Sequence, residues 1–147
     1  VHSDGTVTPI PPAATTLELA PVERADASAV PEPLPAGPTR RLPLGTIAGA
    51  RSGDKGGGAN IGLWVRTDAQ YRWLANTLTV DRVRELLPEA ADLPVTRYLF
   101  PAIRSMNFVI DGILGKGVAY QARFDPQAKG LGEWLRTRHI DIPEEIL

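Results

Sequence analysis

Polar and charged residues are concentrated in residues 51–60, which read Arg-Ser-Gly-Asp-Lys-Gly-Gly-Gly-Ala-Asn. This segment places two cations, Arg51 and Lys55, beside the carboxylate of Asp54, and it ends at the amide of Asn60. Glycines allow positive φ and expose backbone N–H groups, and successive exposed N–H groups can surround a phosphate or a carboxylate. The sequence therefore predicts a loop that binds an anionic group.

The residues of this predicted loop have two candidate roles. Asp54 and Lys55 are the candidate catalytic residues, because the carboxylate could orient the ammonium group or act as a general base. The candidate ligand-binding residues offer cations, a hydroxyl, amides and glycine N–H groups: Arg51, Ser52, Gly53, Gly56, Gly57, Asn60 and Asn107.

Asn107 comes from a second polar cluster, which lies between Arg104 and Asp111. Alternation along a strand would place Ser105, Asn107, Val109 and Asp111 on one face. An amide among apolar neighbours needs hydrogen-bond partners. Asn107 is therefore either a structural residue that bridges to a loop or part of a binding pocket, and both readings stay open.

The glycine run does not match the two common nucleotide-binding patterns. Lys55 precedes the three glycines, whereas the P-loop lysine follows a gap of four residues and a glycine. A strand rather than a helix is predicted after the loop, which excludes the dinucleotide fingerprint. The alternative to an anion site is a hairpin loop whose Asp54 and Lys55 form a surface ion pair of little energy.

The hydrophobic pattern predicts the elements that position these residues. Strands are predicted over residues 42–50, 61–67, 94–100, 105–110 and 118–124. Helices are predicted from caps at Thr67, Thr79 and Asp125, over residues 68–78, 80–87 and 125–138.

This order of strands, helices, strands and helix predicts an α+β fold. It is a two-layer sandwich with a mainly antiparallel sheet and helices on one face. Trp64, Trp73 and Trp134 fall on apolar faces and are predicted to lie in the core. His139 is predicted to cap the last helix, where the dipole favours a cation.

Composition divides the 147 residues into two parts. Nine of the 14 prolines lie in residues 1–43, and every aromatic residue lies beyond residue 63. Residues 1–41 are therefore predicted to be the tail of an upstream domain plus a proline-rich linker over Pro9–Arg41, and residues 42–147 one folded domain. Asp4–Gly5 predicts a hairpin turn. The first residue is not Met, which predicts a fragment, a cleavage product or a trimmed chain.

Composition also argues against several classes of function. The 16 Lys and Arg against 17 Asp and Glu give a net charge of −1, which disfavours a nucleic-acid partner held by bulk charge. No apolar run approaches the roughly 18 to 20 residues that span a bilayer, and no signal peptide is recognised, so we expect a cytoplasmic protein with no membrane partner. Without Cys and with only two His, no metal site is predicted, and no cofactor is predicted either.

Three motifs in this order make residues 42–147 resemble the AtuA family, named for acyclic terpene utilisation. They lie at residues 50–62, 106–112 and 125–130. The resemblance is to the family's small C-terminal domain, and it implies a ferredoxin-like form of the two-layer sandwich. Two positions depart from the family's pattern: Gly58, where a polar residue is common, and Ala102, where Asn is common. Either departure could reduce a polar contact to a ligand, or show that the family's side chain there is dispensable.

The resemblance implies a role in the catabolism of citronellol- or geraniol-type compounds and related branched acids, processed as acyl-CoA thioesters. The loop would bind a CoA phosphate or a carboxylate at the interface with a large N-terminal AtuA domain. An enzyme of this kind would carry out a lyase- or hydratase-type step on an acyl-CoA, completed by that domain. A homo-oligomer is also expected.

Two other functions stay open. The domain could be a non-catalytic assembly or oligomerisation module, in which the glycine run is only a tight structural element. It could also be a nucleotide-binding regulatory domain, which is suggested by fold analogy alone.

Overall fold

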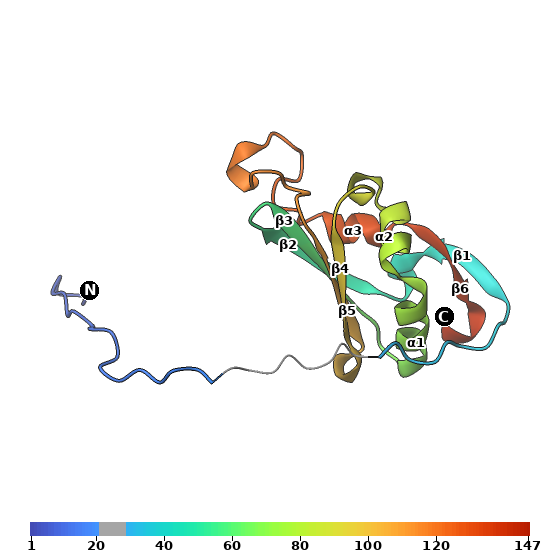
Figure 1. The fold of residues 1–147 in the computed structure, drawn as a ribbon, viewed down its shortest axis with the longest axis horizontal. Coiled ribbons are helices and arrows are strands. Elements are labelled where there is room, and N and C mark those ends of the chain that lie inside the picture. Colours follow the sequence, from blue (N-terminus) through green and yellow to red (C-terminus); the bar gives the residue numbers. More distant parts are fainter. Residues whose placement is uncertain (21–28) are drawn as a thin grey trace.

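A computed structural model describes residues 1–20 and 29–147 of the chain. Three helices and six strands form the folded part (Figure 1). The helices are α1 (Asp68–Thr77), α2 (Val80–Leu86) and α3 (Leu131–Arg136). The strands are β1 (Thr39–Pro43), β2 (Gly49–Lys55), β3 (Gly58–Trp64), β4 (Val95–Phe100), β5 (Ser105–Ile110) and β6 (His139–Pro143).

The main sheet has four strands in the order β2-β3-β5-β4, and every neighbouring pair is antiparallel. Because β3 and β4 both run antiparallel to β5, they are parallel to each other with β5 between them. With α1 and α2 in the connection, this is the split β-α-β unit of ferredoxin-like folds. β1 and β6 form a separate two-stranded ribbon. The predicted α+β ferredoxin-like sandwich is therefore confirmed.

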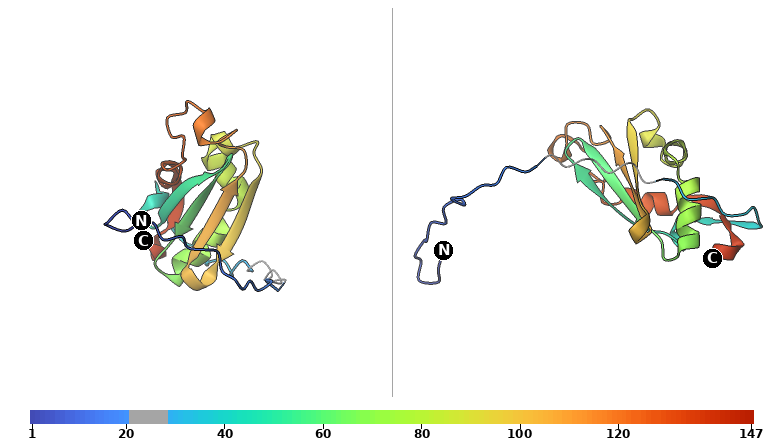
Figure 2. Two further views of the ribbon diagram at one scale, coloured as in Figure 1. Left: turned by 90° about the vertical axis from the view of Figure 1, so that its left-hand side faces the viewer. Right: turned by 60° about the horizontal axis from the view of Figure 1, so that its bottom comes forward.

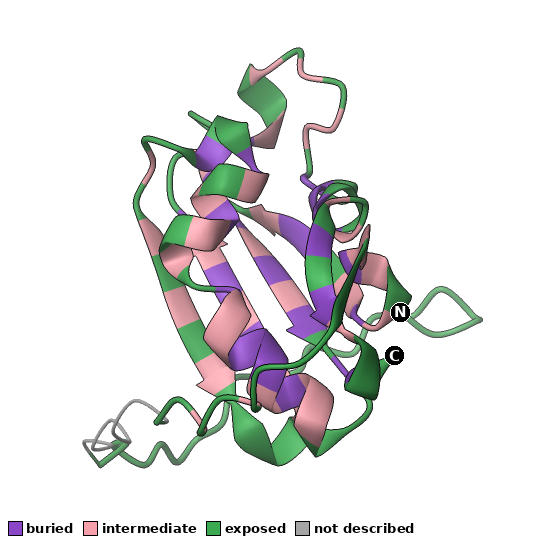
Figure 3. Ribbon diagram, turned by 90° about the vertical axis from the view of Figure 1, so that its right-hand side faces the viewer, coloured by how far each residue is buried: buried purple, intermediate pink, exposed green. Residues whose placement is uncertain are grey.

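The helices all lie on one face of the main sheet, and the core fills the space between the two layers (Figures 1 and 3). Along β3 and β5, buried residues alternate with partly exposed ones, as expected for strands with one covered face. The largest fully buried side chains on these strands are Ile61, Leu63, Met106, Phe108 and Ile110. The opposite face of the sheet carries no helix and faces the viewer in the left view of Figure 2.

The helix caps predicted for α1 and α2 are confirmed. The Thr67 hydroxyl accepts a hydrogen bond from the Gln70 backbone N–H, and the Gln70 side chain accepts one from the Thr67 N–H, which completes a capping box. The Thr79 hydroxyl accepts from the Arg82 N–H in the same way. The strands predicted at 94–100 and 105–110 are also found, as β4 and β5.

Other predicted elements are wrong. The strand predicted over 42–50 is divided between β1 and the start of β2, and the strand predicted at 61–67 begins earlier, at Gly58, and ends earlier, at Trp64. Residues 118–124 form a short 3-10 turn and irregular chain instead of a strand. His139 begins β6, opposite Pro43, and does not cap a helix.

The last helix is shorter than predicted because the chain turns before it can begin. Both carboxylate oxygens of Asp125 accept backbone N–H groups, from Lys129 and Gly130, as in a local turn. Ala128 has a φ of 51°, which is left-handed and incompatible with a right-handed helix. α3 therefore starts at Leu131 rather than at residue 125.

The N-terminal segment has no strand in its described residues before Thr39. The turn at Asp4–Gly5 is present, with Gly5 at a φ of 82°, but the predicted hairpin strands beside it are not. Residues 21–28 of the predicted linker lie outside the described residues. The end of the linker contacts α1, because Arg72 donates hydrogen bonds to the carbonyls of Glu32 and Pro33.

Tyr71 on α1 allows a test of the core. It is 5% exposed, and within the described chain its hydroxyl has no hydrogen-bond partner. Burial raises the pKa of Tyr71 above its usual 10.0, opposed by the charge of Arg97. Because the folded pKa is the higher one, the neutral phenol supports the fold below about pH 10, and this contribution is lost as the pH rises above that value.

We expect Tyr71→Phe to be at least as stable as the parent at neutral pH, since an unpaired buried hydroxyl costs about 1–3 kcal/mol. We also expect it to lose less stability than the parent between about pH 8 and about pH 11. Urea titrations at both pH values measure this, with the exposed Tyr120→Phe as control. A variant that is clearly less stable at neutral pH would show that the hydroxyl is bonded in solution.

Candidate functional site

The glycine-rich segment is a tight β-hairpin, and the predicted ten-residue loop is wrong. β2 extends to Lys55 and β3 starts at Gly58, so only Gly56 and Gly57 lie in the turn. Strand pairing extends so far because the alternating residues of both strands fit the sheet, with Ile61 buried opposite Ser52. The N–H groups of β3 in this segment, and those of the edge strand β2 that face β3, therefore belong to the sheet ladder and not to an anion site.

Close backbone packing explains the glycines of the turn. Gly56 has a φ of 61°, which favours glycine. A Cβ on Gly57 would collide with the carbonyl oxygen of Gly115, because the turn packs on residues 112–117. The Gly57 carbonyl also accepts a hydrogen bond from the Leu114 N–H at 2.8 Å. A Cβ on Gly58 would lie 2.9 Å from the Ile110 carbonyl oxygen.

Strand alternation separates the two candidate catalytic residues. Lys55 is on the face without helices, and its Nζ donates to the backbone carbonyl of Asp54 at 3.0 Å. The Asp54 side chain belongs to the other face, and among the described residues it forms no ion pair. The Asp54–Lys55 ion pair expected from the sequence is therefore absent, and the carboxylate does not orient this lysine.

Ser52 holds α3 on the sheet. Its hydroxyl accepts the Gly132 N–H at 2.8 Å and donates to the Lys129 carbonyl at 3.2 Å, and the residue is 6% exposed. α3 approaches closely because Gly132 has no side chain, and a Cβ there would lie 3.2 Å from the Ser52 hydroxyl oxygen. Ser52 thus packs at the interface of β2 and α3, on the opposite face from Arg51 and Lys55.

The face of the main sheet without helices is called the open face here. Its outward residues follow from the strand registers, and none of them is acidic: Gly49, Arg51, Gly53 and Lys55 on β2, Gly58, Asn60, Gly62 and Trp64 on β3, Ser105, Asn107 and Val109 on β5, and Thr96, Tyr98 and Phe100 on β4. Asp111 follows β5 at the end of this face, beside Gly58.

Cations surround a hollow of about 310 Å³ on the open face, called the cationic hollow. Lys129 from the segment before α3 lines it together with residues of β2 and β3: Arg51, Ser52, Gly53, Lys55, Asn60 and Gly62. Lys129 reaches this face over Gly53, where a Cβ would lie 3.1 Å from its Nζ. In the part of the chain that is described, none of the three cations forms an ion pair. The hollow therefore has a positive potential that an anion would lower.

Asn107 and Asn60 form a pair beside this hollow. The Asn60 amino group donates to the Asn107 side-chain oxygen at 2.9 Å. This bond confirms the predicted face for Asn107 and satisfies one group of each amide. No residue in 1–20 or 29–147 bonds the Asn60 oxygen or the Asn107 amino group, so the structural and the binding readings of Asn107 are compatible.

Aromatic side chains occupy the other half of the open face. Trp64, Tyr98 and Phe100 are 47%, 49% and 45% exposed. The core prediction is thus correct for Trp73, which is 7% exposed, but wrong for Trp64 and for Trp134 on α3, which is 47% exposed. Side chains alternate between the two faces of a strand, so Trp64 lies on the face opposite to that of Ile61 and Leu63. This alternation is the sequence signal that could have placed Trp64 outward.

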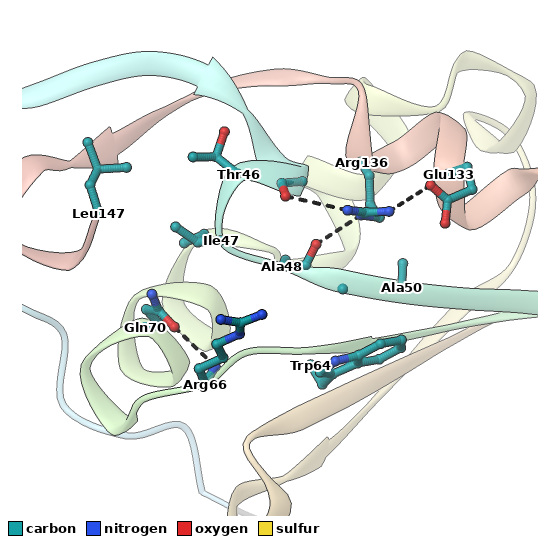
Figure 4. Close-up of a pocket in the computed structure, with 12 residues that line it drawn as sticks. Thr46, Ile47, Ala48, Ala50, Trp64, Arg66, Gln70, Glu133, Arg136 and Leu147 are labelled. Atoms are coloured by element: carbon teal, nitrogen blue, oxygen red, sulfur yellow. Dashed lines mark hydrogen bonds and ion pairs between the residues drawn. The ribbon is translucent and has the colours of Figure 1, made fainter.

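A second hollow, of about 590 Å³, lies at the other end of β2 and is lined by none of the predicted site residues (Figure 4). Arg136 in this hollow is held by Glu133 at 2.7 Å and by the Ala48 carbonyl at 2.9 Å. The Arg66 side chain points into the hollow, and no hydrogen bond of its guanidinium is found among the described residues (Figure 4). Trp64 borders both this hollow and the open face.

The chemistry available on the open face is recognition of an anion and of an apolar or aromatic group. Across residues 1–20 and 29–147, no cluster of three or more His, Cys, Asp or Glu could hold a metal ion. Over the same ranges, no helix is long and apolar enough to cross a bilayer. Lys129, Trp64 and Phe100 join the predicted residues in this arrangement. Ser52 also lines the cationic hollow, but its hydroxyl is bonded to Lys129 and Gly132, and the Asp54 side chain lies on the opposite face.

A family model described as the AtuA ferredoxin-like domain matches residues 42–141. This match confirms the resemblance that the three sequence motifs indicated. No curated protein and no solved structure matches the chain.

Proposed function

The chain belongs to the AtuA ferredoxin-like domain family, and from this premise we propose that its open face binds the anionic part of an acyl-CoA-type ligand. The observation that supports the proposal is the cationic hollow, where Arg51, Lys55 and Lys129 have no carboxylate partner in the described chain. Charge-assisted hydrogen bonds from such groups to a phosphate or carboxylate are among the stronger polar contacts. The binding groups are side chains of a rigid sheet, and not glycine N–H groups of a loop.

The proposal places the ligand between this domain and a large N-terminal AtuA domain in the catabolism of acyclic terpenes. The end of the linker supports a fixed geometry for such an assembly, because Asn76 and Arg72 bind backbone carbonyls between Pro31 and Pro33. A lyase- or hydratase-type step on the acyl-CoA would then need groups from the large domain. Lys55 remains the candidate catalytic residue on the open face, whereas Asp54 on the opposite face could contribute only after a rearrangement.

Titration calorimetry of the full chain with coenzyme A tests the anion site. We expect Arg51→Ala and Lys55→Ala each to weaken binding about tenfold, since a hydrogen bond to a charged group contributes about 1.5–3 kcal/mol. Arg40→Ala is the matched control, because Arg40 is an exposed strand arginine on β1, outside the hollow. The proposal is wrong if the Arg51 and Lys55 variants bind coenzyme A as tightly as the parent does.

A second candidate function is assembly, favoured by the exposed Tyr98 and Phe100 and by Ile103, which is 68% exposed. Exposed apolar patches of this kind mark interaction surfaces. In this reading the open face packs against the large domain or a second copy of the chain. Sedimentation analysis distinguishes assembly from ligand binding. If the open face is an assembly surface, we expect the parent protein to form a dimer, Phe100→Asp to dissociate it, and neither protein to bind coenzyme A.

A further inference from the structure

A slot between two aromatic side chains lies next to the cationic hollow on the open face. Trp64 on β3 and Phe100 on β4 both pair in register with Ser105 on β5, so one residue row contains all three. Gly62, Ile103 and Asn107 complete the lining of this hollow of about 360 Å³, called the aromatic slot.

The slot has room for a flat ring. Two strand spacings of about 4.8 Å separate β3 from β4, which puts the two aromatic residues roughly 10 Å apart at their backbones. The indole of Trp64 lies over Gly49 of β2, on the side of β3 away from β5 and β4, because Gly49 has no Cβ to displace it. The two rings are therefore farther apart than their backbones, which leaves space for a ligand ring that stacks on one of them at about 3.5 Å.

Nothing on β3 blocks the path from the slot to the cations. Gly62 lies between them and has no side chain. A Cβ added there would have only two neighbours within 4 Å, the Arg51 carbonyl oxygen at 3.7 Å and the Asn107 side-chain oxygen at 3.9 Å. Arg51 pairs with Gly62 in the next outward row, about 7 Å along the strands from the row of Trp64. One ligand can therefore contact the slot and the hollow together.

The amide pair selects among the ligand classes that could fill the slot. Among the described residues, the Asn60 oxygen and the Asn107 amino group have no hydrogen-bond partner, and Asn107 lines the slot while Asn60 lines the hollow. A branched acyl chain laid there would cover these polar groups without bonding them, which costs free energy. A nucleobase presents donors and acceptors at its edge and a π-face that stacks on aromatic side chains.

We infer that the open face binds a base-ribose-phosphate group, the nucleotide half of a CoA thioester. The adenine ring lies in the aromatic slot and stacks on Phe100, its edge meets the Asn60–Asn107 pair, and the phosphates lie at Arg51, Lys55 and Lys129. The acyl chain and the thioester then extend away from this domain, where a second domain can act on them. The inference rests on the proposed anion site and adds the identity of the group that is recognised.

Calorimetry of the full chain with three probes tests the inference: coenzyme A, adenosine 3′,5′-bisphosphate, and phosphopantetheine, which has a phosphate but no adenine. We expect the first two to bind with similar affinity and the third at least tenfold more weakly. Phe100→Ala should weaken the adenine-containing probes about tenfold and leave phosphopantetheine unchanged. Gly62→Leu should abolish binding of all three, because its side chain would fill the open path, and the exposed Tyr120→Ala should change nothing.

Two results overturn the inference without touching the proposed anion site. One is phosphopantetheine binding as tightly as coenzyme A, and the other is coenzyme A binding that needs Arg51 but tolerates Phe100→Ala. Binding of coenzyme A that is indifferent to Arg51→Ala overturns both proposals. The affinity of oligoadenylates is a further check. If it exceeds that of the bisphosphate and increases with the length of the oligonucleotide, the ligand is single-stranded RNA and the inference is overturned. Circular dichroism of each variant verifies that a loss of binding is not a loss of folding.

Discussion

Gly57→Ala is expected to lower the free energy of unfolding by about 1–3 kcal/mol, because the new methyl group meets backbone instead of a flexible side chain. The neighbour is the carbonyl oxygen of Gly115, and the hydrogen bond from Leu114 N–H to the Gly57 carbonyl holds the two turns together. One of the two turns must move to admit the Cβ. Urea titration of the full chain measures the change.

Gly62→Ala, on the strand β3 that follows this turn, is the matched control for this experiment. Its Cβ would make only ordinary contacts, at 3.7 and 3.9 Å, so we expect a change within about 0.5 kcal/mol. The comparison also separates two explanations of the glycine run. Alanine keeps the backbone N–H, so Gly57→Ala would weaken coenzyme A binding only if the new Cβ obstructed a ligand at the turn. Weaker binding with unchanged stability would therefore contradict the packing explanation.

Ser52→Ala is expected to cost about 1–3 kcal/mol, because it leaves the Gly132 N–H and the Lys129 carbonyl without their hydroxyl partner. In the described residues, the Gly132 N–H donates to the Ser52 hydroxyl and to no other group. Ser105→Ala is the control, since Ser105 is only partly buried and makes no side-chain hydrogen bond there. Thermal or urea unfolding measures both.

The same variant tests the sequence-based role of Ser52 as a ligand-binding residue. We expect coenzyme A to bind the folded Ser52→Ala protein, with at most a modest loss through the displaced Lys129 backbone. A protein of unchanged stability that no longer binds coenzyme A would restore the direct ligand contact and refute the structural role.

Local sequence signals predicted the parts of the fold that depend on a few neighbouring residues. Thr67 and Gln70 are three residues apart and form the capping box without help from the rest of the chain. β4 and β5 were recognised because β-branched and aromatic residues alternate along them. The helix expected from Asp125 failed because Asp125 instead bonds the N–H groups of Lys129 and Gly130, and composition does not distinguish a cap from such a turn.

The candidate site was predicted in part, for a physical reason. Its cations and amides are recognisable from residue type, but the glycines had two competing uses that look alike in a sequence. Gly57 allows contact with the Gly115 carbonyl, a partner 58 residues away that no local pattern reveals. Lys129 and Phe100 were missed because they reach the open face from distant segments of the chain.

The sequence alone determined the class of this protein: an α+β domain of the AtuA ferredoxin-like family, with a polar cluster at residues 51–60. Motifs, caps and hydrophobic alternation are local properties, so they can be read without coordinates. Only the tertiary structure decided which of the clustered residues act together. Strand alternation turns Arg51 and Lys55 to the open face and Ser52 and Asp54 to the helices, and the register of β3, β5 and β4 brings the aromatic slot beside them. That register depends on pairing across the whole sheet.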